Sequence, residues 1–220
     1  MSENNNVEEF PEKPFNLAKE VFEWFYTIII ALAIAFLIKG FFFDLVRVDG
    51  DSMYPTLHNN DRLIVRKIGY KPECGDIVIL DSNYKAREEY YENLEESTGK
   101  EISDFSKFFK NFTVDDAYKK RYYVKRVIAL PGQVVDIPGD GNVYVDGEMI
   151  DSSYCHTPTY STDPTVEYPI TVEDGNVFVL GDNRGNSTDS RASRLGQVPY
   201  ESIMGKAIFR ILPFNSFGKI

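Results

Sequence analysis

One stretch near the N-terminus restricts the possible folds of this chain more than any other. No charged residue occurs in 24–38, and after Lys39 and a glycine three phenylalanines follow at 41–43. A helix that crosses a hydrocarbon core of about 30 Å needs about 20 mostly apolar residues. The stretch reaches that length if 41–43 continue the helix and Lys39 extends its ammonium to the interface. We therefore expect a transmembrane anchor over 21–44.

Two alternatives to a retained anchor follow from the same residues. A cleaved secretory signal fits poorly, because the preceding segment is acidic and no small-residue cleavage site follows the apolar stretch. A buried helix of a soluble protein stays open, although the stretch lacks a polar face. Residues 1–20 are polar and acidic and are expected to form a disordered or loosely attached tail. Lysines flank the anchor on both sides, so charge does not set its orientation.

Beyond the anchor the apolar period changes to two, which is typical of strands. The pattern predicts a mostly β domain over 45–220, with Asp146-Gly147 as a hairpin turn. The expected strands cover 45–48, 61–67, 76–80, 122–130, 134–137, 143–145, 176–180 and 203–212.

Residues 82–119 interrupt this pattern. They are rich in Glu, Tyr and Phe and contain few β-branched residues, which indicates an inserted helical segment. Its apolar residues at helical spacing are Ile102, Phe105, Phe108, Phe109 and Phe112. Such a face either packs on the β domain as a flap or rests on a membrane surface.

The composition excludes some classes of function. A formal net charge of -10 argues against a nucleic-acid partner, which would favour a basic face. The two cysteines, Cys74 and Cys155, lie far apart and form no metal-ligand pattern, so a disulfide and free thiols both remain open. With two histidines, His58 and His156, there is little material for a zinc site or a histidine-based triad.

Three segments carry residues that can do chemistry. Ser52 lies in a short loop in which Pro55 forbids a regular helix; it is either a turn residue or a nucleophile. Lys125 lies in an expected strand, with Val127 on its face and Arg126 on the other. It is either solvated or buried with a pKa lowered by about three units, which a general base at neutral pH requires.

The third segment is the polar loop at 181–191. Its acidic and basic residues, among them Asp182, Arg184, Asp189 and Arg191, either form an ion-pair network or support a catalytic lysine. The residues of this loop alone do not decide between these alternatives.

Taken together, four segments resemble motifs of the type I signal peptidases, the bacterial leader peptidases of the Ser/Lys endopeptidase family. Ser-Met-Tyr-Pro-Thr-Leu at 52–57 is similar to the nucleophile loop, and 61–67 to the strand that follows it. Lys-Arg-Val-Ile-Ala-Leu-Pro-Gly at 125–132 and the Gly-Asp-Asn-Arg loop at 181–191 are similar to the remaining two. The resemblance covers about 22–213 and is closest to Gram-positive-type members.

The resemblance implies a role for each residue that matches. Ser52 would be the nucleophile, Lys125 the general base, and Ser187 the hydroxyl that orients the lysine amine. Other implied site residues are the supports Asp182, Asp189 and Arg191 and the substrate-groove residues Met53 and Tyr123. No metal or cofactor is implied.

The resemblance also implies a fold and a location. The fold would be the β catalytic domain shared with repressor-type proteases, outside the cytoplasm, behind a single-pass anchor with a cytoplasmic N-terminus. The partners would be preprotein signal peptides and the lipid bilayer, with the secretion machinery as a further candidate. The product would be a preprotein cut after small residues one and three positions before the cleavage site.

Two positions depart from the family pattern. Gly50 stands where some members have a serine that serves the oxyanion hole, and Gly185 stands where an aspartate is common. The departures keep a non-enzymatic anchored β-module open as an alternative. A self-cleaving repressor-type protease is the other alternative, although such proteins carry a DNA-binding head that is missing here.

Overall fold

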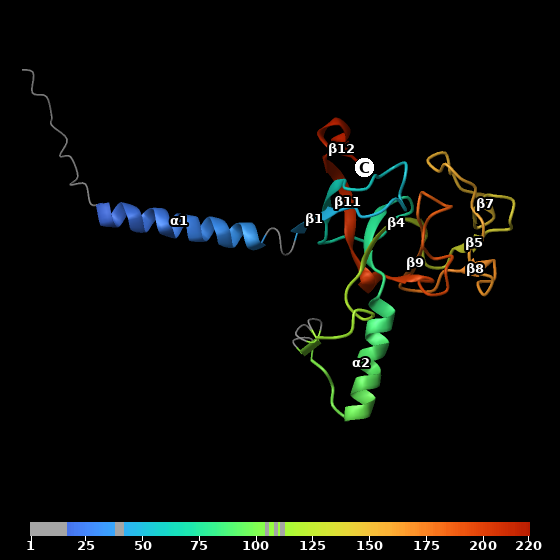
Figure 1. Ribbon diagram of the computed structural model, residues 1–220, viewed down its shortest axis with the longest axis horizontal. Helices are drawn as coiled ribbons and strands as arrows, with labels where there is room; N and C mark the ends of the chain where they lie inside the picture. The colour runs from blue at the N-terminus through green and yellow to red at the C-terminus, as the bar shows by residue number, and fades with distance from the viewer. Residues whose placement is uncertain (1–16, 38–41, 104–105, 108–109, 111–112) are drawn as a thin grey trace, which may run out of the picture. The chain divides into compact units, whose positions relative to one another are not determined.

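The computed structural model describes residues 17–37, 42–103, 106–107, 110 and 113–220. The chain divides into two compact units, Met1–Gly40 and Phe41–Ile220. The first unit contains the helix α1 (Leu17–Leu37), and the second contains all the strands (Figure 1). Among the described residues, no helix has both the length and the apolarity that crossing a membrane requires.

Two expectations for the N-terminal region need correction. Phe43 is not helical but begins the first strand, where it pairs with Arg66, because the backbone there is hydrogen-bonded to a neighbouring strand. The anchor is expected to be helical over 21–44, but the described helix α1 ends at Leu37. Residues 38–41 lie outside the described residues. Of the tail expected over 1–20, residues 17–20 are helical and 1–16 lie outside the described residues.

The second unit is built mostly from short antiparallel strands. Its elements in chain order are β1 (Phe43–Arg47), β2 (Arg62–Arg66), β3 (Ile77–Asp81), α2 (Tyr84–Thr98), β4 (Tyr122–Ala129), β5 (Val134–Asp136), β6 (Tyr144–Val145), β7 (Glu148–Met149), β8 (Ile170–Thr171), β9 (Asn176–Leu180), β10 (Val198–Pro199), η2 (Tyr200–Ser202), β11 (Ile203–Leu212), η3 (Phe214–Ser216) and β12 (Gly218–Lys219).

The larger sheet has eight strands in the order β1-β2-β11-β3-β4-β9-β10, with β12 beside β11. The alternation of side chains explains its packing, since Leu63 and Val65 of β2 are fully buried while Arg62 and Arg66 are exposed. β3 lies between β11 and β4 and is buried along its whole length. The strands expected from the period of two are confirmed, with ends that differ by one to two residues in most cases.

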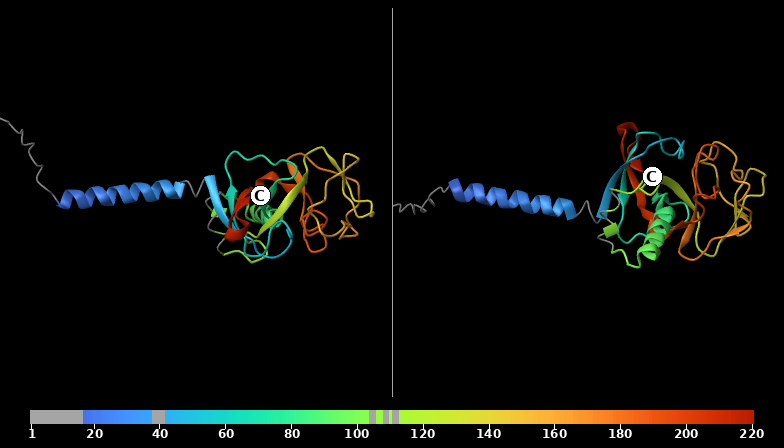
Figure 2. Two further views of the ribbon diagram at one scale, coloured as in Figure 1. Left: turned by 90° about the horizontal axis from the view of Figure 1, so that it is seen from above. Right: turned by 60° about the horizontal axis from the view of Figure 1, so that its bottom comes forward.

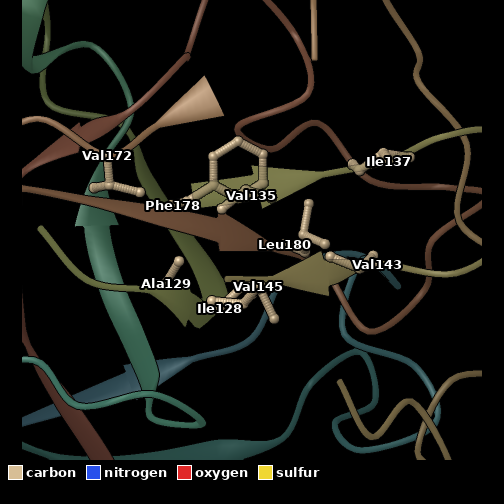
Figure 3. Packing of buried hydrophobic residues seen from close by; sticks show 9 residues of the cluster. All are labelled: Ile128, Ala129, Val135, Ile137, Val143, Val145, Val172, Phe178 and Leu180. Carbon is tan, nitrogen blue, oxygen red and sulfur yellow. The ribbon is translucent and has the colours of Figure 1, made fainter. Parts of the chain in front are cut away.

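The smaller sheet has four strands in the order β7-β6-β5-β8. The expected hairpin is confirmed: β6 and β7 pair on either side of Asp146 and Gly147, which both have positive φ as a type I′ turn requires. A buried apolar cluster joins this sheet to the ends of β4 and β9 (Figure 3). Phe178 and Leu180 of β9 pack there against Val135 and Val145.

The segment at 82–119 contains α2, which extends away from the sheet (Figures 1 and 2). Its base is fixed to the sheet because Arg87 forms a buried ion pair of 2.6 Å with Asp81 at the end of β3. Asn83 closes the insertion by donating to the carbonyl of Lys119 at 2.9 Å. The helix expected around 102–112 lies partly outside the described residues, which do not include 104–105, 108–109 and 111–112.

Both cysteines are free thiols, which decides the alternative that the sequence left open. Cys74 is exposed and Cys155 is half-buried.

Candidate active site

Ser52 lies in the loop that follows β1. The loop is held from below by Met53 and Leu57, whose side chains are almost completely buried in an apolar cluster. One turn of backbone connects them, with the N–H of Leu57 donating to the carbonyl of Met53 at 2.9 Å. Because its neighbour is fixed in the core, Ser52 is presented half-buried at the edge of the sheet.

Lys125 reaches this serine from β4. Its side chain is only 2% exposed, and Nζ donates to Oγ of Ser52 at 2.8 Å and to the carbonyl of Val124 at 2.9 Å. The ammonium also lies 5.1 Å from the ring centre of Tyr123. The two residues that the sequence proposed as nucleophile and base are therefore in direct contact.

Burial lowers the pKa of Lys125 from 10.5 to about 8. The charges of Asp189 and Asp182 act in the opposite direction and limit the shift. With a pKa near 8, about a fifth of the amine is neutral at pH 7.4, compared with about 0.1% for an unperturbed lysine. The amine that touches Ser52 is thus partly deprotonated at neutral pH, as a general base must be.

The polar loop after β9 holds the backbone of the serine loop. The N–H of Asn183 donates to the carbonyl of Ser52, and its side-chain amide donates to the carbonyl of Asp51, both at 3.0 Å. Gly181 allows this close approach, because a Cβ at that position would lie 2.5 Å from the Ser52 carbonyl oxygen. Asn183 is not among the site residues expected from the sequence, although it lies between Asp182 and Arg184 in the Gly-Asp-Asn-Arg motif.

Asp182 connects the serine loop, the lysine strand and the polar loop. It is completely buried and accepts two hydrogen bonds from Arg126, at 2.8 and 2.6 Å, and one from Oγ1 of Thr56 at 2.5 Å. Arg126 also stacks over Tyr154, with its guanidinium 4.3 Å from the ring centre. As expected from the alternation of β4, Arg126 points away from Lys125, and its partner is this carboxylate.

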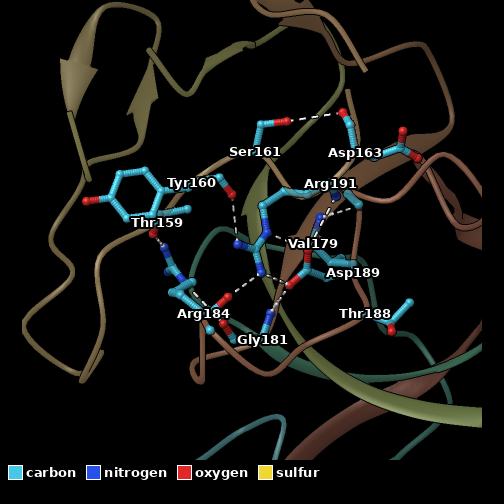
Figure 4. Close-up of polar contacts among 12 residues, drawn as sticks. Thr159, Tyr160, Ser161, Asp163, Val179, Gly181, Arg184, Thr188, Asp189 and Arg191 are labelled. Carbon is cyan, nitrogen blue, oxygen red and sulfur yellow. Dashed lines mark hydrogen bonds and ion pairs between the residues drawn. The ribbon is translucent and has the colours of Figure 1, made fainter. Parts of the chain in front are cut away.

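Asp189 and Arg191 form a second buried pair (Figure 4). Arg191 donates to both carboxylate oxygens, at 2.8 and 2.9 Å, and the N–H of Gly181 donates to the same carboxylate at 3.0 Å. Arg184 is 1% exposed and donates to the carbonyl of Gly181 and to Thr159. Of the ion-pair network expected among the charged residues of this loop, the described residues show one pair within the loop, Asp189–Arg191, while Asp182 pairs with Arg126 of β4. These pairs fix the backbone behind the Ser52–Lys125 contact.

The hydrogen bond through which Ser187 was expected to orient the lysine amine is not seen among the described residues, so this role stays a prediction. The Ser187 hydroxyl is buried and, within the described residues, has no hydrogen-bond partner. It packs against the α-carbon of Gly181, while Lys125 donates to Ser52 and to a backbone carbonyl instead.

A groove of about 510 Å³ leads past the two residues. Its walls are 46–51 from the end of β1 and 121–125 at the start of β4, together with Asn186 and Thr188. Tyr123 lines it as expected. Met53 does not, because its side chain is 1% exposed and fills the core beneath the loop.

Two backbone features of the serine loop concern an oxyanion. In the described part of the chain, the N–H of Ser52 donates to no acceptor, so it can donate to a bound carbonyl. Gly50 has a φ of 90°, which favours glycine, and its N–H donates to Oδ1 of Asn59 at 3.2 Å. A serine at this position would be strained, so the backbone of this loop requires glycine here.

The second departure from the family pattern, Gly185, lies beside Thr157, and the N–H of Gly185 donates to the Thr157 hydroxyl at 3.1 Å.

The comparisons with known proteins agree on one family. The family model of signal peptidase, peptidase S26, matches residues 21–212. Signal peptidase I S of Bacillus subtilis is 34% identical over 91% of this chain and 94% of its own length. A probable signal peptidase I-1 of Synechocystis is 33% identical over 88% of this chain and 83% of its own.

A crystal structure of a signal peptidase I from Enterococcus faecalis is also similar. It is 25% identical in sequence, covers 62% of this chain and 97% of its own, and superposes with a TM-score of 0.39. The family model spans most of the chain, and the curated relatives are matched over most of their lengths. This chain is therefore a peptidase and belongs to the signal peptidase family.

Proposed function

We propose that this protein removes N-terminal signal peptides from exported preproteins, with Ser52 as nucleophile and Lys125 as general base. The observation that carries the proposal is the contact of 2.8 Å between a buried lysine with a pKa near 8 and a hydroxyl at the edge of a groove. A histidine-based alternative lacks such a contact among the described residues, since both histidines flank the ring of Tyr54 instead.

The reaction divides into two steps. The neutral amine of Lys125 takes the proton of the Ser52 hydroxyl as the oxygen attacks the substrate carbonyl, and it then returns this proton to the leaving amine. A water molecule, deprotonated by the same amine, then hydrolyses the acyl-enzyme. The N–H of Ser52 donates to the oxyanion in both steps.

Open edges of β1 and β4 support a binding mode for the substrate. Among the described strands, β1 pairs only with β2, so its other edge is open. Residues 122–125 of β4 likewise pair only with β3 in the described part of the chain, because β9 pairs with β4 from Arg126 onward. An extended peptide can therefore add as a strand between these two edges. In an extended peptide, residues one and three positions before the cut point to the same side, so one wall selects small side chains at both.

The proposal includes a membrane location. We place the N-terminus in the cytoplasm, one span in the part of the expected anchor 21–44 that precedes β1, and the catalytic unit outside the cytoplasm. Its support is the uncharged run at 24–38, the phenylalanines that follow Lys39, and the membrane association of the family. α1 alone falls short of a span. Alkaline extraction of membranes tests the anchor: the full chain stays in the pellet, and recovery in the supernatant would contradict it.

The function is tested with the full chain in detergent and a synthetic signal peptide, with products identified by mass spectrometry. We expect one cut after a small residue, and a loss of at least about 1,000-fold in kcat/KM for Ser52→Ala and Lys125→Ala. Ser153→Ala and Lys100→Ala change the same residue types at exposed positions and serve as matched controls. Near-full activity of Lys125→Ala would show that the base is another group, and absence of any cut would favour the non-enzymatic β-module.

A further inference from the structure

A second cavity adjoins the groove and is not used by the mechanism above. It has a volume of about 160 Å³ and lies where α2 leaves β3. Arg121, Tyr123 and Thr188 line both spaces, so the cavity and the groove are neighbours on either side of these side chains. The remaining walls come from 81–86 and from 194–202.

The charged side chains around this cavity are mostly cationic. Lys85, Arg121 and Arg194 line it, and Asp81 is the only carboxylate among the lining residues. The charge of Asp81 is balanced by Arg87, with which it forms the buried ion pair, and its carboxylate also accepts a hydrogen bond from the N–H of Arg121 at 3.1 Å. In a chain with a net charge of -10, this is a local excess of positive charge beside the substrate groove.

Both arginines lie next to residues that the cavity shares with the groove: Arg121 lines both spaces, and Arg194 lines the cavity and contacts Thr188, which lines both. Arg194 donates to the hydroxyl of Thr188 at 2.5 Å, and the guanidinium of Arg121 lies 5.5 Å from the ring centre of Tyr123. Within the described residues, neither arginine forms an ion pair. Each guanidinium therefore has donors left for a carboxylate, which it binds in a planar, two-pronged geometry.

We propose that this cavity is a specificity subsite that binds a carboxylate side chain of the substrate, Asp or Glu, a few residues from the bond that Ser52 attacks. The inference rests on the proposed function and names a substrate feature for the same site. Arg121 and Arg194 hold the carboxylate at the mouth of the cavity, and Lys85 adds positive charge from α2. The insertion thereby contributes one wall of the substrate site.

The test compares peptides that differ only in charge. A carboxylate residue and its neutral amide, Glu and Gln, are placed in turn at each position within five residues of the cut, on both sides. The measured quantity is the ratio of kcat/KM for the Glu peptide to that for the Gln peptide with each enzyme. For the wild type we expect a ratio of about threefold to tenfold at one or two adjacent positions, which low salt increases.

Variants connect the ratio to the arginines. In Arg121→Gln/Arg194→Gln the ratio falls to about one, and in Arg194→Glu it falls to one or below, because the new carboxylate repels the Glu peptide. Arg62→Gln/Arg66→Gln removes two exposed arginines of β2 that line neither the groove nor the cavity, and it keeps the wild-type ratio. Because each ratio is taken within one enzyme, a change in overall activity does not affect it.

Two results overturn the inference and are distinct from failure of the proposed function. A wild type that cleaves the neutral peptides but prefers Glu at no position has no such subsite. A preference that survives in the double variant lies elsewhere in the groove. If the wild type cleaves none of the peptides, the proposed function fails, and the subsite fails with it.

Discussion

The Nζ of Lys125 lies 2.8 Å from the Oγ of Ser52 although 73 positions separate the two residues in the chain. The serine is held by a loop anchored in one apolar cluster, and the lysine by a strand in the middle of the larger sheet. Burial of the lysine produces its low pKa, so the same packing that brings the groups together also prepares the base.

The pH dependence of cleavage should follow the amine of Lys125. Because only the neutral amine accepts a proton, kcat/KM should rise about tenfold per pH unit below pH 8 and level off above it. Initial rates with a synthetic signal peptide between pH 5 and 10 measure this profile.

His58→Gln/His156→Gln removes both histidines of the chain; it is the control and should leave the profile unchanged. A midpoint that moves in this control, or one near the ordinary lysine value of 10.5 in the wild type, would contradict the assignment.

Lys125→Met should stabilise the fold while abolishing activity. The folded state favours the neutral amine, so at pH 6 the native protein bears the cost of holding the protonated form. A pKa lowered from 10.5 to about 8 corresponds to about 3 kcal/mol, reduced by the hydrogen bonds that the substitution removes. Urea unfolding of both proteins in detergent measures the difference.

The sign of this effect also depends on pH. From pH 8 to 10.5 the unfolded chain keeps a proton that the folded chain has lost, so wild-type stability rises with pH and the advantage of Met shrinks. Lys100→Met, at an exposed position, should show no such trend. An advantage of Lys125→Met that stays constant up to pH 11 would argue against burial as the cause.

Gly181→Ala should reduce activity by at least about 100-fold, because the new methyl group would meet the Ser52 carbonyl at 2.5 Å and the Ser187 hydroxyl beside it. The backbone must shift, which should also cost about 1–3 kcal/mol of stability. Gly185→Ala is the matched control in the same loop, since its Cβ would have Thr157 at an ordinary distance of 3.5 Å. Equal losses of activity in both variants would show that the close approach of Gly181 to the Ser52 carbonyl is not the reason.

Asp182→Asn should destabilise the protein by about 3–5 kcal/mol, because it leaves the guanidinium of Arg126 without its buried counter-charge. Thermal unfolding and cleavage rates should both fall, since Thr56 of the serine loop also bonds to this carboxylate. Asp116→Asn removes a carboxylate from an exposed pair with Lys119 and should change neither quantity measurably. A fully stable Asp182→Asn variant would show that the pair is not structural.

Much of the larger sheet could be predicted because its strands have one face toward a core and the other toward polar surroundings. That alternation is visible in 62–66, where Leu63 and Val65 are buried and Arg62 and Arg66 are exposed. The end of the N-terminal helix could not be predicted in the same way. Phe43 is as apolar as the helix before it, and pairing with β2 makes it a strand.

The sequence by itself determined the family, the nucleophile and base candidates, and the position of the turns, since these depend on residue types at fixed spacing. The tertiary structure decided which groups touch. It placed Met53 in the core, left the Ser187 hydroxyl without a hydrogen bond to any residue that the structure describes, and paired Asp182 with Arg126. It also brought Arg121 and Arg194 to one cavity beside the groove. Contacts between distant segments depend on strand order and on packing around the sheet, which local spacing does not encode.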